Sequence, residues 1–173
     1  MRLPASIFSA VSARIDALEP SRKQLLQRMA VVGQQVSLDL LQALTGESGA
    51  TLNLWLKDLV AQQLIRAQRA ATPTWVFARP VVQEACYRGL LDQQRQDLHH
   101  AVASAMRELE PEAPEQLALI AEHYAAAGDH DAAALGYLGA ARAIHWLRTD
   151  QAARYYELAA RSAAQAQADE AEV

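Results

Sequence analysis

Histidines offer the first chemistry to consider in this sequence, because imidazole is a common ligand of zinc. Four of the five histidines form two pairs, His99 with His100 and His123 with His130. Adjacent residues of a helix point about 100° apart, so His99 and His100 do not easily share one ion. No cysteine or carboxylate stands at helical ligand spacing to complete a tetrahedral set around the second pair. We therefore expect packing or solvated histidines and no bound metal.

The other reactive side chains also favour structural roles. Cys86 is the single cysteine and has apolar neighbours, which is typical of a buried, inert thiol rather than a nucleophile. Glu84 and Arg88 stand four residues apart, a spacing at which an ion pair stabilises a helix by roughly 0.2–0.5 kcal/mol. No spacing suggests a Ser-His-Asp set, and neither a G-x-x-x-x-G-K-[ST] phosphate loop nor the metal-binding aspartate pair of a nucleotide cyclase is recognisable. We expect neither enzymatic activity nor a cofactor.

Composition limits the remaining function classes. The chain has 173 residues, 51% of them hydrophobic, and a formal net charge of −4. It can therefore bury a core, but it lacks the cationic surplus of a general nucleic-acid surface. The single cysteine excludes an internal disulfide and fits a reducing compartment. With no apolar run of a signal peptide and no stretch near the roughly 18 apolar residues that span a bilayer, we expect a cytoplasmic protein without a membrane partner.

Periodic apolar residues and capping residues predict a series of helices that would position these side chains. The first two run over about 6–18 and 20–33, and Gly33 is the expected left-handed cap of the second. After a short extended piece, Ser37 caps a third helix that closes at Gly46.

A fourth helix and a β-hairpin complete this first set of elements. Thr51 is the expected cap of the helix, and its expected buried face consists of apolar residues at helical spacing: Leu52, Trp55, Leu56, Leu59 and Val60. Two strand-like pieces follow at 64–67 and 74–77, joined by a loop that contains Pro73. The order of helix, turn, helix and two-stranded wing predicts a winged-helix domain.

The prolines after the hairpin predict the domain boundary. Helices are expected over about 80–91 and 92–109, and the two prolines of the segment Glu110–Pro114 then forbid a continuous helix. We therefore expect a winged-helix-like domain with trailing helices over 1–110. A tetratricopeptide-like helical region is expected over 111–173.

Small and aromatic residues of the second region stand at tetratricopeptide spacing. The Gly128-Asp129 turn is expected to separate two antiparallel helices, with Ala133 where the helices approach closely and Tyr137 filling the gap. The same small–aromatic–small spacing recurs at Ala152, Tyr156 and Ala159. That recurrence comes too soon for a regular repeat of roughly 34 residues. The predicted fold class is mainly α, with one good repeat and an irregular continuation.

Several short motifs follow one another along almost the whole chain. They are Leu3-Pro4-Ala5-Ser6, Ala13-Arg14-Ile15-Asp16-Ala17-Leu18, Arg22-Lys23-Gln24-Leu25-Leu26-Gln27, Ala30-Val31-Val32-Gly33, a block with Phe77, Gln83, Glu84 and Tyr87, then Arg95, Leu98 and His99, and finally His123, Tyr124, Ala127 and Gly128. This ordered series resembles the segment that directly follows the nucleotide-binding core in bacterial signalling ATPases of the STAND class. That class includes ATP-binding LuxR-type transcriptional regulators and proteins in which a class III nucleotide cyclase precedes the ATPase.

The resemblance implies a non-catalytic regulatory and protein-interaction module. Full-length relatives carry an ATPase and sometimes a cyclase domain, and this module would couple an unknown effector protein or ligand to the ATPase core in cis or in trans. It further implies that four residues contact that core. Arg79 directly precedes the helix expected over 80–91, and Gln83, Glu84 and Tyr87 lie within it. The Arg-His pair that the family has after its phenylalanine is Ala78-Arg79 here, followed by Pro80, so this chain departs from the family at that point.

A partner surface is expected in the second region. Tyr124, Tyr137 and Trp146 would lie on the concave face of a superhelical arm, where exposed aromatic side chains mark a partner groove. The alternative for Trp146 is ordinary core packing.

The alternative function is that of a sequence-specific DNA-binding winged-helix regulator. Its reading helix would offer Asn53 and Lys57 to base edges, while Arg66 and Arg69 would contact phosphate. Specific binding usually needs several phosphate contacts per module, so this thin basic set favours protein packing over DNA binding.

Overall fold

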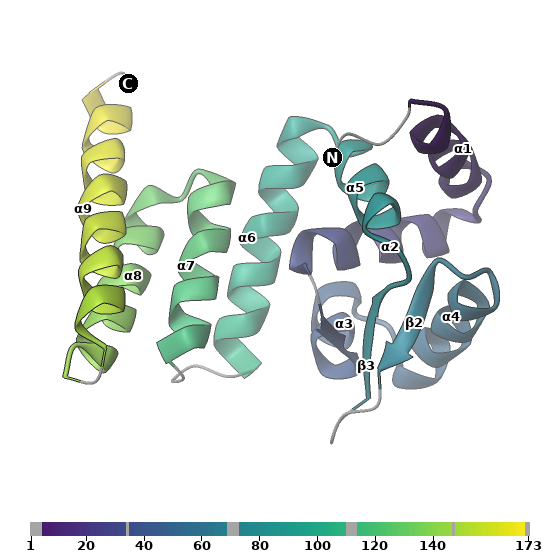
Figure 1. Ribbon diagram of the computed structural model, residues 1–173, viewed down its shortest axis with the longest axis horizontal. Helices are drawn as coiled ribbons and strands as arrows, with labels where there is room; N and C mark the ends of the chain where they lie inside the picture. Colours follow the sequence, from purple (N-terminus) through teal and green to yellow (C-terminus); the bar gives the residue numbers. More distant parts are fainter. Residues whose placement is uncertain (1–4, 34, 69–72, 110–113, 147, 172–173) are drawn as a thin grey trace. The chain divides into compact units, whose positions relative to one another are not determined.

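The computed structural model describes residues 5–33, 35–68, 73–109, 114–146 and 148–171. The described residues form nine helices and three short strands, so the prediction of a mainly helical chain is confirmed (Figure 1). The chain divides into two compact units, Met1–Arg95 and Gln96–Val173. Each unit has its own set of buried apolar residues.

The first unit combines five helices with a three-stranded sheet. Its elements are α1 (Ala5–Asp16), α2 (Pro20–Val32), β1 (Val36–Ser37), α3 (Leu38–Thr45), α4 (Gly49–Ala61), β2 (Ile65–Gln68), β3 (Thr74–Phe77) and α5 (Pro80–Arg88). Both β1 and β2 pair antiparallel with β3, which gives the order β1-β3-β2. Val36 lies opposite Trp75, and Ile65 lies opposite Phe77. The predicted hairpin is therefore part of a larger sheet, because the short extended piece after α2 supplies a third strand.

Leucine side chains of α2, α3 and α4 form the centre of the first unit. Those with at most 1% exposure are Leu25, Leu26, Leu41, Leu52, Leu56 and Leu59. The face predicted for α4 is wrong at its two margins, because Trp55 is only half-buried and Val60 is 37% exposed. Both residues flank the buried stripe of the helix rather than lying at its centre.

Capping residues end several helices as the sequence predicts. The Ser37 hydroxyl accepts the backbone N–H of Leu40 at 3.3 Å and so caps α3, which closes at Gly46 with a φ of 70°. Gly33 ends α2 with a φ of 114°, but its ψ of −130° lies outside the left-handed helical region expected for it.

Two predicted helix ends are wrong. The cap of α4 is Ser48 rather than Thr51, since the Ser48 hydroxyl accepts the backbone N–H of Thr51 at 3.1 Å. Helix α5 ends at Arg88 instead of near Leu91. The backbone N–H of Leu91 donates to the side chain of Gln94 at 3.2 Å, and this return bond places Leu91 at the start of the next helix.

The second unit is built from antiparallel helices. Helix α6 (Asp92–Leu109) begins at the end of the first unit, and α7 (Pro114–Ala127), α8 (His130–Ile144) and α9 (Thr149–Ala171) follow, each beside the one before it (Figure 1). Gly128 turns the chain after α7 with a φ of 83°. Asp129 then caps α8, because its carboxylate accepts the backbone N–H of Ala132 at 3.0 Å.

Small residues allow α7 and α8 to approach closely. Ala133 and Ala140 are fully buried and Tyr137 is 4% exposed, as the tetratricopeptide spacing predicts. The tightest point is Gly136, where an added Cβ would lie 2.9 Å from the Cβ of Ala121. In α9 the expected pattern is partly wrong, because Tyr156 is 41% exposed. Among the described residues of the second unit, α9 packs chiefly against α8, which leaves its outer side open.

The division between the two compact units falls within the first turn of α6. The reason is that α6 shares side-chain contacts with α7. The rings of His99 and His123 are in contact, and Arg107 lies over the ring of Tyr124 at 5.7 Å. Residues 110–113, which carry the first proline of the predicted boundary, are outside the described residues. None of the described helices is both long enough and apolar enough to cross a bilayer.

Candidate functional site

Helix α5 holds three of the four residues expected to contact an ATPase core, and Arg79 precedes it. Arg79 is exposed at the N-cap position of the helix. The amide of Gln83 donates to the backbone carbonyl of Ala30 at 3.4 Å, so this side chain also holds α5 against α2. The carboxylate of Glu84 accepts from Arg88 at 2.7 Å, in the ion pair that their spacing suggests.

Tyr87 lies on the same face of α5 as Gln83, one turn later. Its ring is half-buried, and the guanidinium of Arg95 lies over it at 5.2 Å from the ring centre. The four expected contact residues therefore divide into two groups. Gln83 and Tyr87 are half-buried and have partners within the first unit. Arg79 is exposed, and Glu84 keeps 42% of its side chain exposed beside Arg88.

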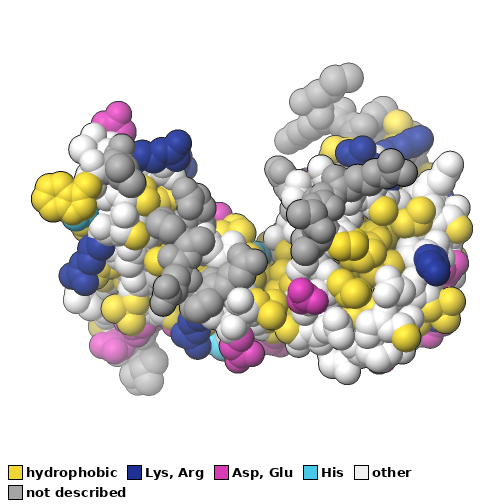
Figure 2. Space-filling model, turned by 90° about the horizontal axis from the view of Figure 1, so that it is seen from below, with side chains coloured by type: hydrophobic (Ala, Val, Ile, Leu, Met, Phe, Trp, Pro, Cys, Tyr) yellow, Lys and Arg dark blue, Asp and Glu magenta, His cyan; other side chains and the backbone are white. Residues whose placement is uncertain are grey.

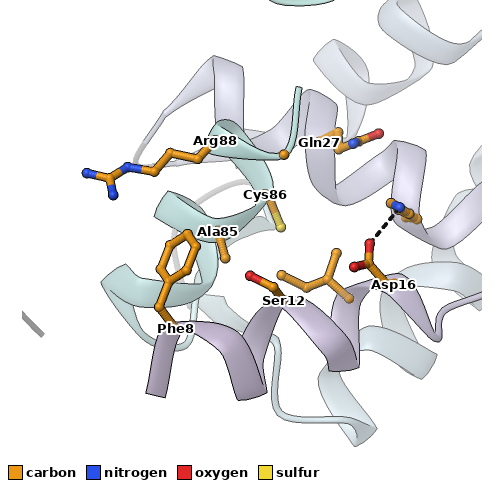
Figure 3. A pocket seen from close by; sticks show the side chains of 10 residues that line it. Phe8, Ser12, Asp16, Gln27, Ala85, Cys86 and Arg88 are labelled. Carbon is orange, nitrogen blue, oxygen red and sulfur yellow. Dashed lines mark hydrogen bonds and ion pairs between the residues drawn. The ribbon is translucent and has the colours of Figure 1, made fainter. Parts of the chain in front are cut away.

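A small pocket lies between α1, α2 and α5 (Figure 3). Its volume is about 130 Å³, below the roughly 300–1,000 Å³ of pockets that take small-molecule ligands. Cys86 from α5 and Ser12 from α1 point into it, whereas the guanidinium of Arg88 extends outward, 5.7 Å from the ring centre of Phe8. An ion pair of 2.8 Å between Lys23 and Asp16 lies at its side. The size suits a few water molecules or one side chain rather than a cofactor.

The thiol at the floor of this pocket is poorly suited to nucleophilic chemistry. Cys86 is 1% exposed, and burial raises the pKa of its thiol to about 12. A thiol must ionise to act as a nucleophile, so this one stays neutral and unreactive at physiological pH. The position agrees with the inert, buried cysteine expected from its apolar neighbours.

The exposed face of α4 carries the side chains proposed to read DNA. Asn53 is exposed, but its amide donates to the backbone carbonyl of Gly49 at 2.7 Å. Lys57 is exposed and is the only basic residue of the helix. The same face exposes apolar side chains, with Leu54 at 63% and Val60 at 37%.

Basic side chains near the sheet add little positive charge to this face. Arg66 on β2 is exposed, and Arg69 lies outside the described residues. On the part of the first unit that Figure 2 shows in colour, basic side chains stand singly or in small groups among hydrophobic and uncharged ones. They do not gather there into the continuous patch that phosphate binding requires.

The three aromatic residues of the expected partner surface lie in different environments. Tyr124 and Tyr137 are each 4% exposed, so they are core residues and cannot line a surface groove. Burial raises the pKa of the Tyr137 hydroxyl to about 12. Only Trp146 is available to a partner, with 85% of its surface exposed and its ring 4.2 Å from that of His145.

A pair of buried histidines escaped prediction. The Nδ1 atoms of His99 and His123 are 2.8 Å apart, and the two residues are 7% and 4% exposed. The sequence suggested pairs of neighbours, His99 with His100 and His123 with His130, whereas packing of α6 against α7 joins one member of each. His100 instead lies 3.7 Å from Asp129, and His130 lies 3.8 Å from Asp169.

Within the described ranges, no group of three or more histidine, cysteine, aspartate or glutamate side chains is placed to hold an ion. The two sites with distinct chemistry are therefore the outer side of α5, with Arg79 and Glu84, and the closed imidazole pair between α6 and α7. Comparison of the chain with protein-family models, curated proteins and solved structures found no match.

Proposed function

We propose that this chain is a non-catalytic regulatory and protein-interaction module of a bacterial signalling ATPase of the STAND class. It would pack on a nucleotide-binding core, in cis or in trans, and transmit the binding of a protein or ligand to that core. Cytoplasmic location belongs to the same proposal. The resemblance of the ordered motifs to such proteins gives the starting point, and features of both units support it.

The order of elements in the first unit supports a winged-helix assignment. Helix α2 is followed by β1, the α3–α4 helix pair and the β2–β3 hairpin, and β1 adds to the hairpin to give the order β1-β3-β2. A helix–turn–helix followed by a β-hairpin wing has this sequence of elements. In such a fold α4 takes the place of the recognition helix.

The exposed face of α4 is the observation that carries the choice of a protein partner. It presents Leu54 and Val60 with Lys57 as its one cation. Each phosphate contact requires a cationic or donor group, and a module that binds DNA makes several of them. Exposed leucine and valine gain little from DNA but gain from burial against another protein. The α4 face therefore favours protein packing over DNA recognition.

The second unit supports a tetratricopeptide-like assignment. Helices α7 and α8 form an antiparallel hairpin with small residues at the crossing, Ala121 against Gly136, and with Tyr137 buried between them. Such hairpins stack into arms that present extended surfaces to other proteins. In this unit the exposed ring of Trp146 is the side chain best placed to contribute to a partner contact.

The proposed mechanism is a shift between two states of the ATPase core. Contact through Arg79 and Glu84 would favour one state, and occupancy of the arm by an effector would change the strength of that contact. The module needs no reactive group for this role. Its own contribution is a rigid helix, α5, fixed by the Gln83–Ala30 hydrogen bond and by packing on α1 and α2.

A binding titration tests this proposal. The purified chain is titrated into the nucleotide-binding core of a STAND-class ATPase from the same genome and followed by isothermal calorimetry. We expect saturable binding that falls at least about tenfold when Arg79→Glu and Glu84→Lys are combined, because both changes reverse exposed charges. Lys57→Glu on α4 is the matched control and should change the affinity less if α5 is the docking helix. A chain that bound duplex DNA but not the core would favour the DNA-binding alternative.

A further inference from the structure

The outer side of α8 carries a row of large side chains. The core contacts of the helix are made on its other side, by Ala133, Tyr137, Ala140, Ala141 and Ile144. His145 keeps helical backbone angles, with a φ of −58° and a ψ of −28°, so Trp146 follows one turn after Arg142 on the outer side. Four residues at helical spacing therefore form what we call the α8 row: Leu135, Leu138, Arg142 and Trp146.

Three side chains of the α8 row are apolar, and two of these are open to water. Leu135 is 71% exposed and Trp146 is 85% exposed, and Leu138 is half-buried between them. Leu135 and Trp146 stand about three turns, or about 16 Å, apart along the helix axis. Exposed apolar side chains over this length match the anchors of a second helix that lies along the first. Tryptophan and arginine are also the residues that most often dominate the energy of protein contacts.

The indole of Trp146 is supported by its neighbour. The Nδ1 atom of His145 donates to the backbone carbonyl of Arg142 at 2.8 Å, which holds the imidazole against the end of the helix. The centre of that ring lies 4.2 Å from the centre of the Trp146 ring. A side chain that is supported before binding loses less conformational entropy when a partner covers it. The exposed tryptophan is thus partly preorganised for a contact.

The charge of the α8 row is positive, although the net charge of the chain is −4. The side chain of Arg142 is exposed and forms no ion pair or hydrogen bond with any described residue. No aspartate or glutamate occurs between Asp131 and Asp150, whereas Arg148 adds a second cation just beyond the row. Asp131, the nearest carboxylate on this side of the helix, stands about 16 Å before Arg142. A carboxylate of a partner would therefore complement the middle of the row.

We propose that the α8 row binds an amphipathic helix of a partner protein, in which an aspartate or glutamate pairs with Arg142. Apolar side chains of that helix, placed before and after the carboxylate, would cover Leu135 and Trp146. The proposal names the kind of effector that the helical arm receives, and so it rests on the proposed function.

The position of Arg142 argues against a second copy of this chain as the partner. The middle of the row lies between Ala140 and Ala141. Two rows that paired antiparallel about this point would bring their Arg142 side chains to about 5 Å of each other along the axis, and a parallel pair would place them face to face. Like charges at such distances repel. Nucleic acid is a poor match as well, because phosphate binding needs several cations and the row has one.

Selection from a peptide-display library with the full chain as bait tests the proposal. The library consists of helical peptides of about 20 residues, with leucine at two positions three turns apart and every residue type allowed between them. We expect the enriched peptides to carry aspartate or glutamate midway between the leucines. We also expect the most enriched peptide to bind the full chain saturably in fluorescence anisotropy.

Two variants of the row check that this peptide binds where the proposal places it. Trp146→Ala should weaken its binding at least about tenfold. Arg142→Glu should also weaken it at least about tenfold, and a peptide with lysine in place of its acidic residue should restore the affinity. Arg161→Glu, an exposed charge reversal on α9 outside the row, is the matched control and should leave the affinity within about twofold. Circular dichroism checks that each variant is folded, and Trp146→Ala alone carries the test if Arg142→Glu is not.

Several results would overturn the proposal. They are a library without enriched peptides, enriched peptides that are neutral or basic between the leucines, and equal affinity for the unmodified chain and Trp146→Ala. Binding through Trp146 to vesicles of neutral and anionic phospholipid, without enrichment of acidic peptides, would assign the row to a membrane surface instead. The Arg79→Glu and Glu84→Lys double variant should bind the enriched peptide as the unmodified chain does. Failure of the ATPase contact and failure of the α8 contact are therefore measured separately.

Discussion

Gly136 shows at the scale of one residue how the helical hairpin of the second unit depends on size. A Cβ added there would lie 2.9 Å from the Cβ of Ala121 and 3.5 Å from the backbone carbonyl of Leu117. A contact of 2.9 Å cannot be kept, so one helix has to shift. Replacement of a helical glycine normally gains up to about 1 kcal/mol of helix propensity. At this position the cost of overpacking is expected to exceed that gain.

We therefore predict that Gly136→Ala destabilises the second unit by about 1–3 kcal/mol in urea unfolding. Gly139 is the matched control because it lies in the same helix and its added Cβ would come no closer than 3.7 Å to a neighbour. Gly139→Ala should be neutral or stabilising by up to about 1 kcal/mol. Equal effects of the two substitutions would contradict the close crossing at Ala121.

Cys86 provides a second prediction for a single residue. Because burial raises the pKa of its thiol from 9.0 to about 12, iodoacetamide at pH 8 should label the folded chain far more slowly than the chain unfolded in urea. The unfolded thiol ionises first, so this residue should also reduce the stability of the fold as the pH rises above about 9. Mass spectrometry of the labelled protein measures the rate. Labelling at the same rate with and without urea would show that the pocket beside α1 opens freely.

At the scale of elements, α4 has two faces with opposite expected roles. Leu56 is 1% exposed at the centre of the first unit, whereas Leu54 is 63% exposed on the outer face of the same helix. We predict that Leu56→Ala lowers the free energy of unfolding by about 2–5 kcal/mol, because it leaves a cavity in the core. Leu54→Ala should change it by no more than about 0.5 kcal/mol. Circular dichroism during urea unfolding compares the two, and a large loss from Leu54→Ala would contradict the exposed face.

The sequence predicts helix positions well where a capping residue has no competitor. Ser37 and Gly46 bound α3 as expected, since the neighbours of Ser37 are the apolar Val36 and Leu38 and no other glycine stands within one position of Gly46. At α4, Ser48 and Thr51 are both hydroxyl residues three positions apart, and either could start the same apolar stripe. The structure selects Ser48, whose hydroxyl contacts both the N–H and the side chain of Thr51. The local pattern alone does not distinguish the two.

The candidate sites show why tertiary contacts are harder to predict than elements. The pairing of His99 with His123 joins residues 24 positions apart and depends on how α6 packs on α7. Tyr124 and Tyr137 were expected on a surface, but aromatic residues of packed helices also fill the space between them, and here both are only 4% exposed. Trp146 lies two residues after the end of α8 and is exposed, which the periodicity of the helix does not reveal. The exposed Glu84–Arg88 pair followed directly from spacing because its partners lie on one helix.

At the scale of the whole molecule, a unit of five helices and a three-stranded sheet is followed by a unit of packed helices. The apolar outer face of α4 and the sparse cations of the first unit support protein partners, and the net charge of −4 agrees with that choice. The exposed charges at the start of α5 are the proposed point of contact with an ATPase core.

Steady-state hydrolysis of ATP tests the central claim most directly. The chain alone, and a STAND-class nucleotide-binding core from the same genome with increasing amounts of the chain, are assayed for release of phosphate. We predict no hydrolysis by the chain alone and a saturable change in the rate of the core, reduced by the Arg79→Glu and Glu84→Lys double variant. Turnover of ATP by the chain itself, or a core whose rate is the same at every concentration of the chain, would contradict the account.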